Sequence, residues 1–409
     1  MRKRVVITGL GMVSPLGNTP DNAYQNAIEG KNCIKEITSF DTDGLNVKIA
    51  AQVKDFDASK YLSKRDIRRQ DLYSQYAVYA SMEAFEDANL KDKVNPDDVG
   101  VILGTGMGGM QTFAKDLNHA FKGGYKRIPP MFIPMIIPNM ASGNVSIALN
   151  AQNHSTAVTT ACAAGTHAIG DAFRHIQHGY AEVMIAGGTE AGVNPYTLAG
   201  FNAISALTTN DDVTKASRPF DKERDGFVLG EGAGILVLES LDHALKRNAK
   251  IYAEVIGYGS TSDAYHITAP SGKGAIKAME NALKDANIQK EDVDYINAHG
   301  TSTPLNDKFE TEAIKHVFKD HAYALKVSST KSMHGHALGG TGGLEAVLSV
   351  KTIENGVIPP TINLENKDEE CDLNYVPNKA LKEKVNVVMS NSLGFGGHNA
   401  ILLFRKYEG

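Results

Sequence analysis

One pattern of residues occurs twice in this chain and predicts its architecture. Its first copy, residues 79–106, is YASMEAFEDANLKDKVNPDDVGVILGTG: a helix-forming run, a turn rich in Asn, Pro and Asp, and an apolar strand that ends in Gly-Thr-Gly. Its second copy, residues 277–301, is KAMENALKDANIQKEDVDYINAHGT and passes through the same elements in the same order. Such repetition predicts two similar α/β halves, with helices packed on mostly parallel sheets and with the loops at the strand C-termini meeting between the halves.

A second pair of segments repeats a strand, a turn and a helix. In the first, a β-prone run stops at Cys162, and small residues open a helix. Its counterpart is the strand at 326–331, followed by a glycine-rich turn and a helix from about Thr341. We therefore predict an N-terminal half, residues 1–250, that carries the cysteine, and a C-terminal half, residues 251–409, that carries two histidines and a glycine-rich loop.

Cys162 is a candidate nucleophile. The first N–H groups of a helix have no intrahelical partner and the dipole there is positive, so a thiol at this place is expected to have a lowered pKa. The alternative is a buried structural cysteine. His299 and His336 each lie beside glycine in a polar turn, and a cysteine with two such histidines favours acyl transfer.

The composition of the 409 residues is that of a globular protein, with 42% hydrophobic and 22% charged residues. A net charge of −5 provides no overall attraction to nucleic acid or to anionic membranes. Cys33, Cys162 and Cys371 are too few for a disulfide framework, which predicts a reducing compartment, the cytoplasm. The apolar run at the N-terminus is broken by glycines and predicts a strand rather than a signal peptide, and no apolar stretch approaches the ~20 residues of a membrane helix.

Residues 128–138, IPPMFIPMIIP, are apolar, and their prolines argue against a regular helix. This segment is expected to be buried, either within its own chain or as the lining of a subunit interface or of an acyl cavity. The sequence leaves these alternatives open.

Two patterns suggest cofactors and are rejected. Residues 104–109 match G-x-G-x-x-G, but a polar stretch and the proline-rich segment follow in place of a βαβ unit with its acidic residue, and no Walker A motif occurs. His334 and His336, with His299, suggest a metal site, but no carboxylate or cysteine stands nearby in sequence to complete a zinc set. We predict neither a cofactor nor a metal.

Four motifs resemble those of β-ketoacyl-[acyl-carrier-protein] synthases, in the order and spacing of the elongating type II enzymes of bacterial fatty acid synthesis. They are TTACAAG at 159–165, HGTSTP at 299–304, KSMHGH at 331–336 and NSLGFGGHN at 391–399. The resemblance extends from Val5 to the C-terminus. It implies the thiolase-like fold, a duplicated five-layered α-β-α-β-α sandwich, and a homodimer.

The resemblance also implies a mechanism and a partner. Cys162 would take an acyl group from its thioester on acyl-carrier protein, with the N–H groups of Cys162 and Phe395 as the oxyanion hole and Phe395 as a gate. His299 and His336 would stabilise the enolate left when malonyl-carrier protein loses CO2, and Lys331 would orient them. The product would be a β-ketoacyl-carrier protein in fatty acid elongation.

Supporting residues follow from the same motifs. Glu345 is a candidate partner of Lys331, with a solvated helix charge as the alternative, and Thr301 and Thr303 support the site. The acyl pocket is expected to be lined by Met107, Phe132 and Ile133.

This chain departs from the family pattern at two positions. His334 stands where relatives often carry Thr, and Ser205 where many carry an Arg used in carrier docking. Carrier docking would then depend on a basic patch, which is Lys64, Arg65, Arg68 and Arg69, with an ordinary solvated helix face as the alternative.

Three rival functions share some of these features. A type II polyketide ketosynthase has every one of these catalytic residues and differs in what fills the pocket. A non-catalytic chain-length partner normally lacks the cysteine, so Cys162 argues against it. A cysteine hydrolase would need water access and a histidine base beside its thiol. The residues around Cys162 do not resemble those of papain-like or caspase-like enzymes.

Overall fold

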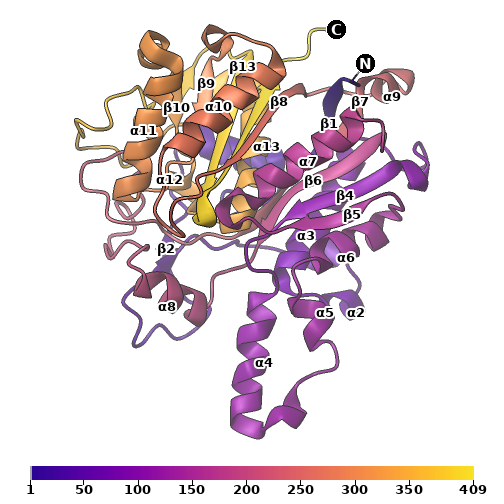
Figure 1. The fold of residues 1–409 in the computed structure, drawn as a ribbon. Helices are drawn as coiled ribbons and strands as arrows, with labels where there is room; N and C mark the ends of the chain where they lie inside the picture. Colours follow the sequence, from indigo (N-terminus) through magenta and orange to yellow (C-terminus); the bar gives the residue numbers. More distant parts are fainter. Residues whose placement is uncertain (1) are drawn as a thin grey trace.

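Each half of the chain contributes five strands to the main sheet of the computed structural model, which describes residues 2–409 (Figure 1). The strands of the first half are β1 (Val5–Val13), β4 (Val99–Gly104), β5 (Ser155–Val158), β6 (Val183–Glu190) and β7 (Gly232–Ser240). Those of the second half are β8 (Ala253–Ser262), β9 (Tyr295–Asn297), β10 (Lys326–Ser328), β13 (Val387–Gly394) and β14 (His398–Arg405). From its outer edge inward, each half has the same strand order: third, second, fourth, fifth, first. The duplication predicted from the repeat is therefore confirmed.

Two helices lie between the two sets of strands. α7 (Ala164–Gln177) and α13 (Thr341–Asn355) each contact strands of both halves. α13 is buried along nearly its whole length, as expected of a helix that is covered on every side. α3 (Leu72–Asp87) and α6 (Met140–Leu149) cover the outer face of the first half, and α10 (Lys273–Ala286) and α11 (Pro304–Phe318) cover that of the second. The result is the five-layered α-β-α-β-α sandwich.

The remaining elements lie in the connections, and all of them except α4 are short. They are α1 (Pro20–Ile28), β2 (Lys35–Glu36), β3 (Ile49–Ala50), η1 (Ala58–Lys60), α2 (Lys64–Ile67), η2 (Pro96–Asp98), α4 (Met110–Gly123), η3 (Tyr125–Arg127), α5 (Phe132–Ile136), η4 (Ala161–Ala163), α8 (Pro195–Ala203), α9 (Leu241–Lys246), η5 (Lys290–Asp292), η6 (Lys319–Tyr323), α12 (Lys331–His334), η7 (Leu338–Gly340), β11 (Val357–Ile358), β12 (Leu381–Lys382) and η8 (Phe395–Gly397).

The expectation of mostly parallel sheets is confirmed with one exception in each half. In each half the second, third and fourth strands run parallel, but the fifth is antiparallel to both of its neighbours. In the second half the reason is visible in the chain, because only Phe395–Gly397 separate β13 from β14. A connection this short makes a hairpin, since a parallel crossover needs about a dozen residues.

The proline-rich segment also differs from expectation, because residues 132–136 form the short helix α5. Pro134 is its third residue, where a backbone N–H would have no intrahelical partner, so the proline is tolerated there. α4 and α5 project from the body of the molecule at the bottom of Figure 1. The side chain of Ile133 remains 58% exposed, so this apolar segment is not buried within its own chain.

Close backbone contacts set the positions of the two central helices. A Cβ on Gly234 of β7 would lie 2.2 Å from the carbonyl carbon of Gly343 in α13, and one on Gly104 of β4 would lie 2.2 Å from that of Ala164 in α7. Larger residues would push the helices away from the strands. The glycines therefore let both helix N-termini reach the centre of the molecule.

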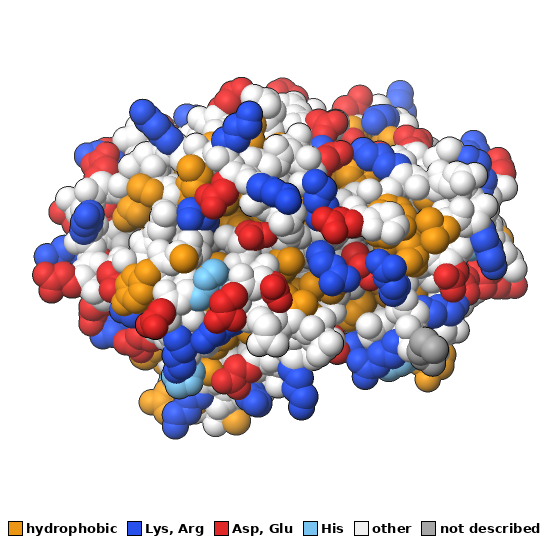
Figure 2. All heavy atoms as spheres, turned by 90° about the horizontal axis from the view of Figure 1, so that it is seen from above, with side chains coloured by type: hydrophobic (Ala, Val, Ile, Leu, Met, Phe, Trp, Pro, Cys, Tyr) orange, Lys and Arg blue, Asp and Glu red, His pale blue; other side chains and the backbone are white. Residues whose placement is uncertain are grey.

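The surface carries mixed charges. On the face seen in Figure 2, Lys and Arg side chains are interspersed with Asp and Glu, so this face has no block of one sign. Among the residues described, no helix has both the length and the apolar character to cross a bilayer.

Candidate active site

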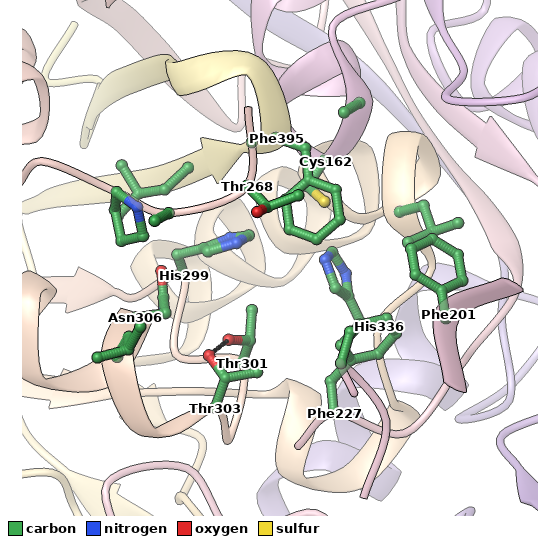
Figure 3. Close-up of a pocket in the computed structure, with 18 of the residues that line it drawn as sticks. Cys162, Phe201, Phe227, Thr268, His299, Thr301, Thr303, Asn306, His336 and Phe395 are labelled. Carbon is green, nitrogen blue, oxygen red and sulfur yellow. Dashed lines mark hydrogen bonds between the residues drawn. The ribbon is translucent and has the colours of Figure 1, made fainter. Parts of the chain in front are cut away.

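Loops from both halves meet around one cavity of about 500 Å³. Cys162, His299, His336 and Phe395 all line it, and Figure 3 shows the two imidazole rings and the phenyl ring facing the sulfur. Cys162 follows β5, His299 follows β9, and His336 follows β10 and α12, so the loops lie at the C-terminal ends of strands. The predicted meeting of these loops between the halves occurs here.

Cys162 lies in the 3-10 turn η4 between β5 and α7. Ala161 before it has a φ of 50°, in the left-handed region that residues with a Cβ rarely adopt. This turn directs the thiol into the cavity at the start of a central helix. Backbone strain of this kind recurs at active sites.

The expectation of a lowered thiol pKa is wrong. Burial raises the pKa of Cys162 to about 11, although the positive charge of Lys331 and the N–H groups of Phe395 and Cys162 act in the opposite direction. The helix N-terminus therefore does not compensate for the loss of hydration, and Cys162 is a thiol at rest.

Both histidines are neutral. Burial lowers the pKa of His299 and of His336 well below the usual value, and the positive charge of Lys331 lowers both further. The two rings are 5.4 Å apart between centroids and nearly perpendicular. The Nδ1 atom of His336 is hydrogen-bonded to Thr341 Oγ1 at 3.0 Å. With the Thr341 hydroxyl as donor, the ring proton of His336 is on Nε2, which leaves a donor for the cavity.

The loop of His299 is held by α11. Glu310 accepts hydrogen bonds from the backbone N–H groups of His299 and Gly300, both at 2.8 Å. Asp307 accepts one from Thr301 at 2.9 Å. Two buried carboxylates of one helix thus fix the turn that presents the imidazole.

Lys331 and Glu345 form a buried ion pair, Lys331 Nζ to Glu345 Oε1. Glu345 is therefore fully buried and not a solvated helix charge. Burial raises the pKa of Glu345 to about 7, and Lys331 opposes this. The ammonium group of Lys331 has no hydrogen bond to either imidazole among the residues described, so it acts on the histidines through its charge.

Phe395 begins the turn between β13 and β14, and its next residue, Gly396, has a φ of 82°. This turn is tied to the loop after β8. The Gly396 N–H donates to the Ile267 carbonyl at 2.7 Å, and the Asp263 N–H donates to the Gly397 carbonyl at 2.8 Å. The predicted gate is therefore linked to a second loop that also borders the cavity.

Among the predicted pocket residues, Met107 lines the cavity, whereas Phe132 and Ile133 lie outside it. Phe132 stacks on Phe113, with ring centroids 6.2 Å apart. Thr301 and Thr303 also line the cavity, and their hydroxyl groups are hydrogen-bonded to each other at 2.9 Å.

Sequence reasoning missed several apolar lining residues, namely Phe201, Phe227 and Leu338. The Phe227 ring stands edge-on to His336 at 5.2 Å, and the Phe201 ring lies between Phe227 and Phe395. Phe227 lies in the glycine-rich run RDGFVLGEGAG at 224–234, and this run was a usable signal. Phe201 lies in α8 and had no such signal.

The basic patch surrounds α2, and all four of its side chains are exposed. Within residues 2–409, none of the four forms an ion pair. Ser205, which carries no charge, lines the cavity and has a φ of 53°.

The structure changes the argument about metal ions. His334 does not face the cavity; its Nε2 atom is hydrogen-bonded to Thr330 Oγ1 at 2.9 Å. Cys162 replaces His334 in the candidate set of metal ligands, because one ligand atom from each of Cys162, His299 and His336 lies within 4.8 Å of the others. A cysteine thus stands near the histidines in space although it is distant in sequence, so the sequence argument against a metal does not hold for this trio.

A duplicated α/β sandwich with a cysteine at the start of a central helix and two neutral histidines facing it defines the thiolase-like class of acyl-transferring enzymes. The chain belongs to the β-ketoacyl synthase family: residues 2–244 match the model of the β-ketoacyl synthase N-terminal domain, and residues 252–365 match that of the C-terminal domain.

Relatives match over the whole length. The chain is 52% identical to 3-oxoacyl-[acyl-carrier-protein] synthase 2 of Synechocystis sp. over 100% of this chain and 99% of the relative. It is 51% identical to the protein of the same name from Staphylococcus aureus strain COL, over 99% of each. Among solved structures, the ishigamide ketosynthase/chain length factor superposes with a TM-score of 0.95 at 37% identity, covering 100% of both chains.

The raised pKa of Cys162 predicts how the thiol reacts with iodoacetamide. Below the pKa the thiolate fraction grows about tenfold per pH unit, so alkylation of Cys162 should accelerate by about that factor per unit from about pH 6 to about pH 9. Mass spectrometry of the Cys162 peptide measures the rate, with the Cys162→Ala protein as the control for labelling elsewhere. A plateau near neutral pH would show that the helix N-terminus outweighs burial.

Proposed function

We propose that this protein catalyses the decarboxylative condensation of an acyl group, held on Cys162, with malonyl-acyl-carrier protein in fatty acid elongation. The observation that carries the proposal is the meeting of Cys162, His299 and His336, with reactive atoms within 4.8 Å of one another, beside the backbone N–H of Phe395. The relatives at 51–52% identity bear the name of such synthases. A polyketide ketosynthase remains the nearest alternative, and the lower identity of 34–37% to ketosynthases of that kind favours fatty acid elongation.

In the first half-reaction Cys162 Sγ attacks the carbonyl carbon of an acyl thioester. The N–H groups of Cys162 and Phe395 point to the sulfur, and they are placed to receive the oxyanion that forms beside it. The carbon–sulfur bond to the carrier then breaks, and the carrier thiolate leaves with the proton that Cys162 has lost. The products are acyl-Cys162 and free carrier thiol.

In the second half-reaction malonyl-carrier protein loses CO2, and its electron pair forms an enolate. Neutral His299 and His336 donate hydrogen bonds to the enolate oxygen, and the nearby charge of Lys331 favours the negative species. The enolate carbon attacks the carbonyl carbon of acyl-Cys162. The Cys162 thiolate leaves and takes up a proton, and the β-ketoacyl group remains on the carrier.

The substrate arrives on a carrier protein. Thr301 and Thr303 offer hydroxyl groups in the lining of the cavity, which suits the polar arm that links an acyl chain to a carrier. The basic patch carries four exposed cations that form no ion pair among the described residues. Such a patch suits an acidic partner. The solved complex of a type II polyketide ketosynthase with its acyl-carrier protein has the same fold as this chain, with a TM-score of 0.93.

We further propose a homodimer in a reducing, cytoplasmic compartment. β5 is an edge strand of the sheet, and an edge strand exposes unpaired backbone groups. Beside it α6 exposes Ile147 by 78%, and α5 exposes Ile133. A second copy of the chain would cover this edge and its apolar flank. Each copy would consist of two halves, residues 1–250 and 251–409, because each of these segments contains one complete set of five strands.

The two half-reactions can be separated by mutation. His299→Ala and His336→Ala should still acquire the acyl mass from an acyl-carrier thioester but should lose decarboxylation of malonyl-carrier protein by about 10²-fold or more, because each variant lacks an enolate donor. Intact-protein mass and CO2 release are the measurements. Cys162→Ala should acquire no acyl group, and Cys33→Ala and Cys371→Ala should behave as the wild type.

Three results would contradict this assignment. Loss of both steps in a histidine variant would indicate a base that activates Cys162. Acyl mass on Cys33 or Cys371 with Cys162 unmodified would refute the nucleophile. Stoichiometric zinc that turnover requires would replace the hydrogen-bonding role of the histidines by metal ligation.

The carrier patch predicts a change in KM. The double reversal Lys64→Glu with Arg68→Glu should raise KM for carrier-bound substrates about tenfold, with kcat and the reaction of small carrier-free thioesters nearly unchanged, because docking is weakened and chemistry is not. The wild-type KM should rise with salt, since exposed charges are screened beyond about 8 Å at physiological ionic strength.

A matched control lies at the far end of α3. Lys91→Glu with Lys93→Glu makes the same change of charge at exposed positions that lie beyond the C-terminal end of α3 and outside the patch. It should leave KM nearly unchanged. An unaltered KM in the Lys64–Arg68 double variant would mean that the patch is an ordinary solvated surface.

The proposed dimer predicts the effect of a charge at its interface. Ile147→Glu should convert the dimer into a monomer at micromolar concentration, because an unpaired carboxylate would have to be buried against the second copy. Sedimentation velocity measures the mass. Leu245→Glu, at a comparably exposed leucine of α9, is the control and should stay dimeric. A monomeric wild type would contradict the proposal.

A further inference from the structure

Glu190, the last residue of β6, is a fully buried carboxylate that takes no part in the steps above. Four donors converge on it. Oε1 accepts hydrogen bonds from Thr105 Oγ1 at 3.0 Å and from the Met107 N–H at 3.2 Å, and Oε2 accepts from the Gly106 N–H at 2.6 Å and from the Gly339 N–H at 3.1 Å. Within residues 2–409 it has no cationic partner, so these hydrogen bonds alone replace its lost hydration.

The four donors come from two loops of different halves. Thr105, Gly106 and Met107 follow β4 of the first half, whereas Gly339 belongs to η7, which follows His336 in the second half. The loop after β4 is tightened further, because the Gly108 N–H donates to Thr105 Oγ1 at 3.1 Å. One carboxylate thus joins the two halves behind the cavity.

Each of the two loops places an apolar side chain in the cavity. Met107 and Leu338 both line it. Leu338 has a φ of 45°, in the left-handed region, so its backbone depends on neighbouring contacts to keep this conformation. There is no spare room behind these loops: a Cβ on Gly106 would lie 2.9 Å from Glu190 Oε2, and one on Gly192 would lie 2.8 Å from Met107 Cε.

We propose that Glu190 is a positioning residue for acyl-chain length: by holding the loops of Met107 and Leu338 against each other, it fixes the apolar wall that long acyl chains contact and short ones do not. The proposal rests on acyl transfer to Cys162. The carboxylate contacts three backbone N–H groups and the Thr105 hydroxyl, and it does not line the cavity.

Glu190→Gln tests the proposal. The carboxamide has nearly the same size, but only one of its two terminal atoms is an acceptor, and its NH2 group would face an N–H donor. Acylation of Cys162 by dodecanoyl-carrier thioester should fall about tenfold relative to acylation by butanoyl-carrier thioester, which should change little. Glu190→Asp keeps the charge but is shorter by one methylene, so it should show an intermediate loss.

A second readout separates positioning from simple loss of stability. The negative charge of Glu190 raises the pKa of Cys162. Removal of that charge in Glu190→Gln should lower this pKa and accelerate alkylation of Cys162 at fixed pH, whereas Glu190→Asp should leave the rate close to that of the wild type.

Glu231→Gln is the matched control. Glu231 is also a buried carboxylate, and burial raises its pKa to about 7. It accepts hydrogen bonds from the Val53 N–H at 3.0 Å and from Tyr76 Oη at 3.3 Å. It does not line or support the cavity. Its variant should lose thermal stability without a change in the ratio of long-chain to short-chain acylation.

The outcomes are distinct. An unchanged chain-length ratio in folded Glu190→Gln, or the same change in Glu231→Gln, would overturn the role of Glu190. If the wild-type protein acquires no acyl group from either thioester, the proposed function itself fails.

Discussion

The close contact between the starts of the two central helices is the constraint on which the rest of the structure depends. A Cβ on Gly165 of α7 would lie 2.9 Å from the Gly343 nitrogen of α13, and one on Gly342 would lie 2.5 Å from the Thr166 nitrogen. Only residues without a side chain allow this approach. The turn of Cys162 and the turn of His336 precede these helices, so the contact that closes the core also brings the nucleophile to its histidine.

Burial then decides the charges of the site. Loss of water raises the pKa of the Cys162 thiol and lowers the pKa of both imidazoles, so three neutral groups face the cavity of the resting enzyme. Lys331 supplies positive charge nearby and is itself compensated by Glu345. Negative charge is consequently favoured only where a reaction creates it, at the thiolate, the oxyanion or the enolate, which is how a preorganised site stabilises transition states more than ground states.

The sequence predicts most of the framework and the chemical residues, for identifiable reasons. The repeat of 79–106 in 277–301 depends on local patterns, and the corresponding elements α3, β4, α10 and β9 are present. The helix expected from about Thr341 begins at that residue as α13. The antiparallel fifth strands and the raised pKa of Cys162 could not be predicted in this way, because pairing direction and desolvation depend on what the whole fold places around a segment.

The same difference explains why only part of the predicted pocket lining faces this cavity. Met107 belongs to the repeated loop and lines the cavity, but Phe132 and Ile133 lie on the projecting segment outside it, and the position of that segment is not encoded in its local pattern. Leu338 and Phe201 reach the cavity through tertiary packing alone. The sequence alone does not reveal the role of Glu190 either, because the four donors that converge on it come from loops more than 140 residues apart in the chain.

In the proposed reaction, the protonation states of the histidines also account for the fate of the acyl-enzyme. Hydrolysis would need a group that takes a proton from water, and an imidazole whose pKa lies well below its usual value is a poor base. The same neutral imidazole is a good hydrogen-bond donor to an enolate, which needs no base because loss of CO2 has already supplied its electron pair. Burial of His299 and His336 thus favours carbon–carbon bond formation over the attack of water on the same thioester.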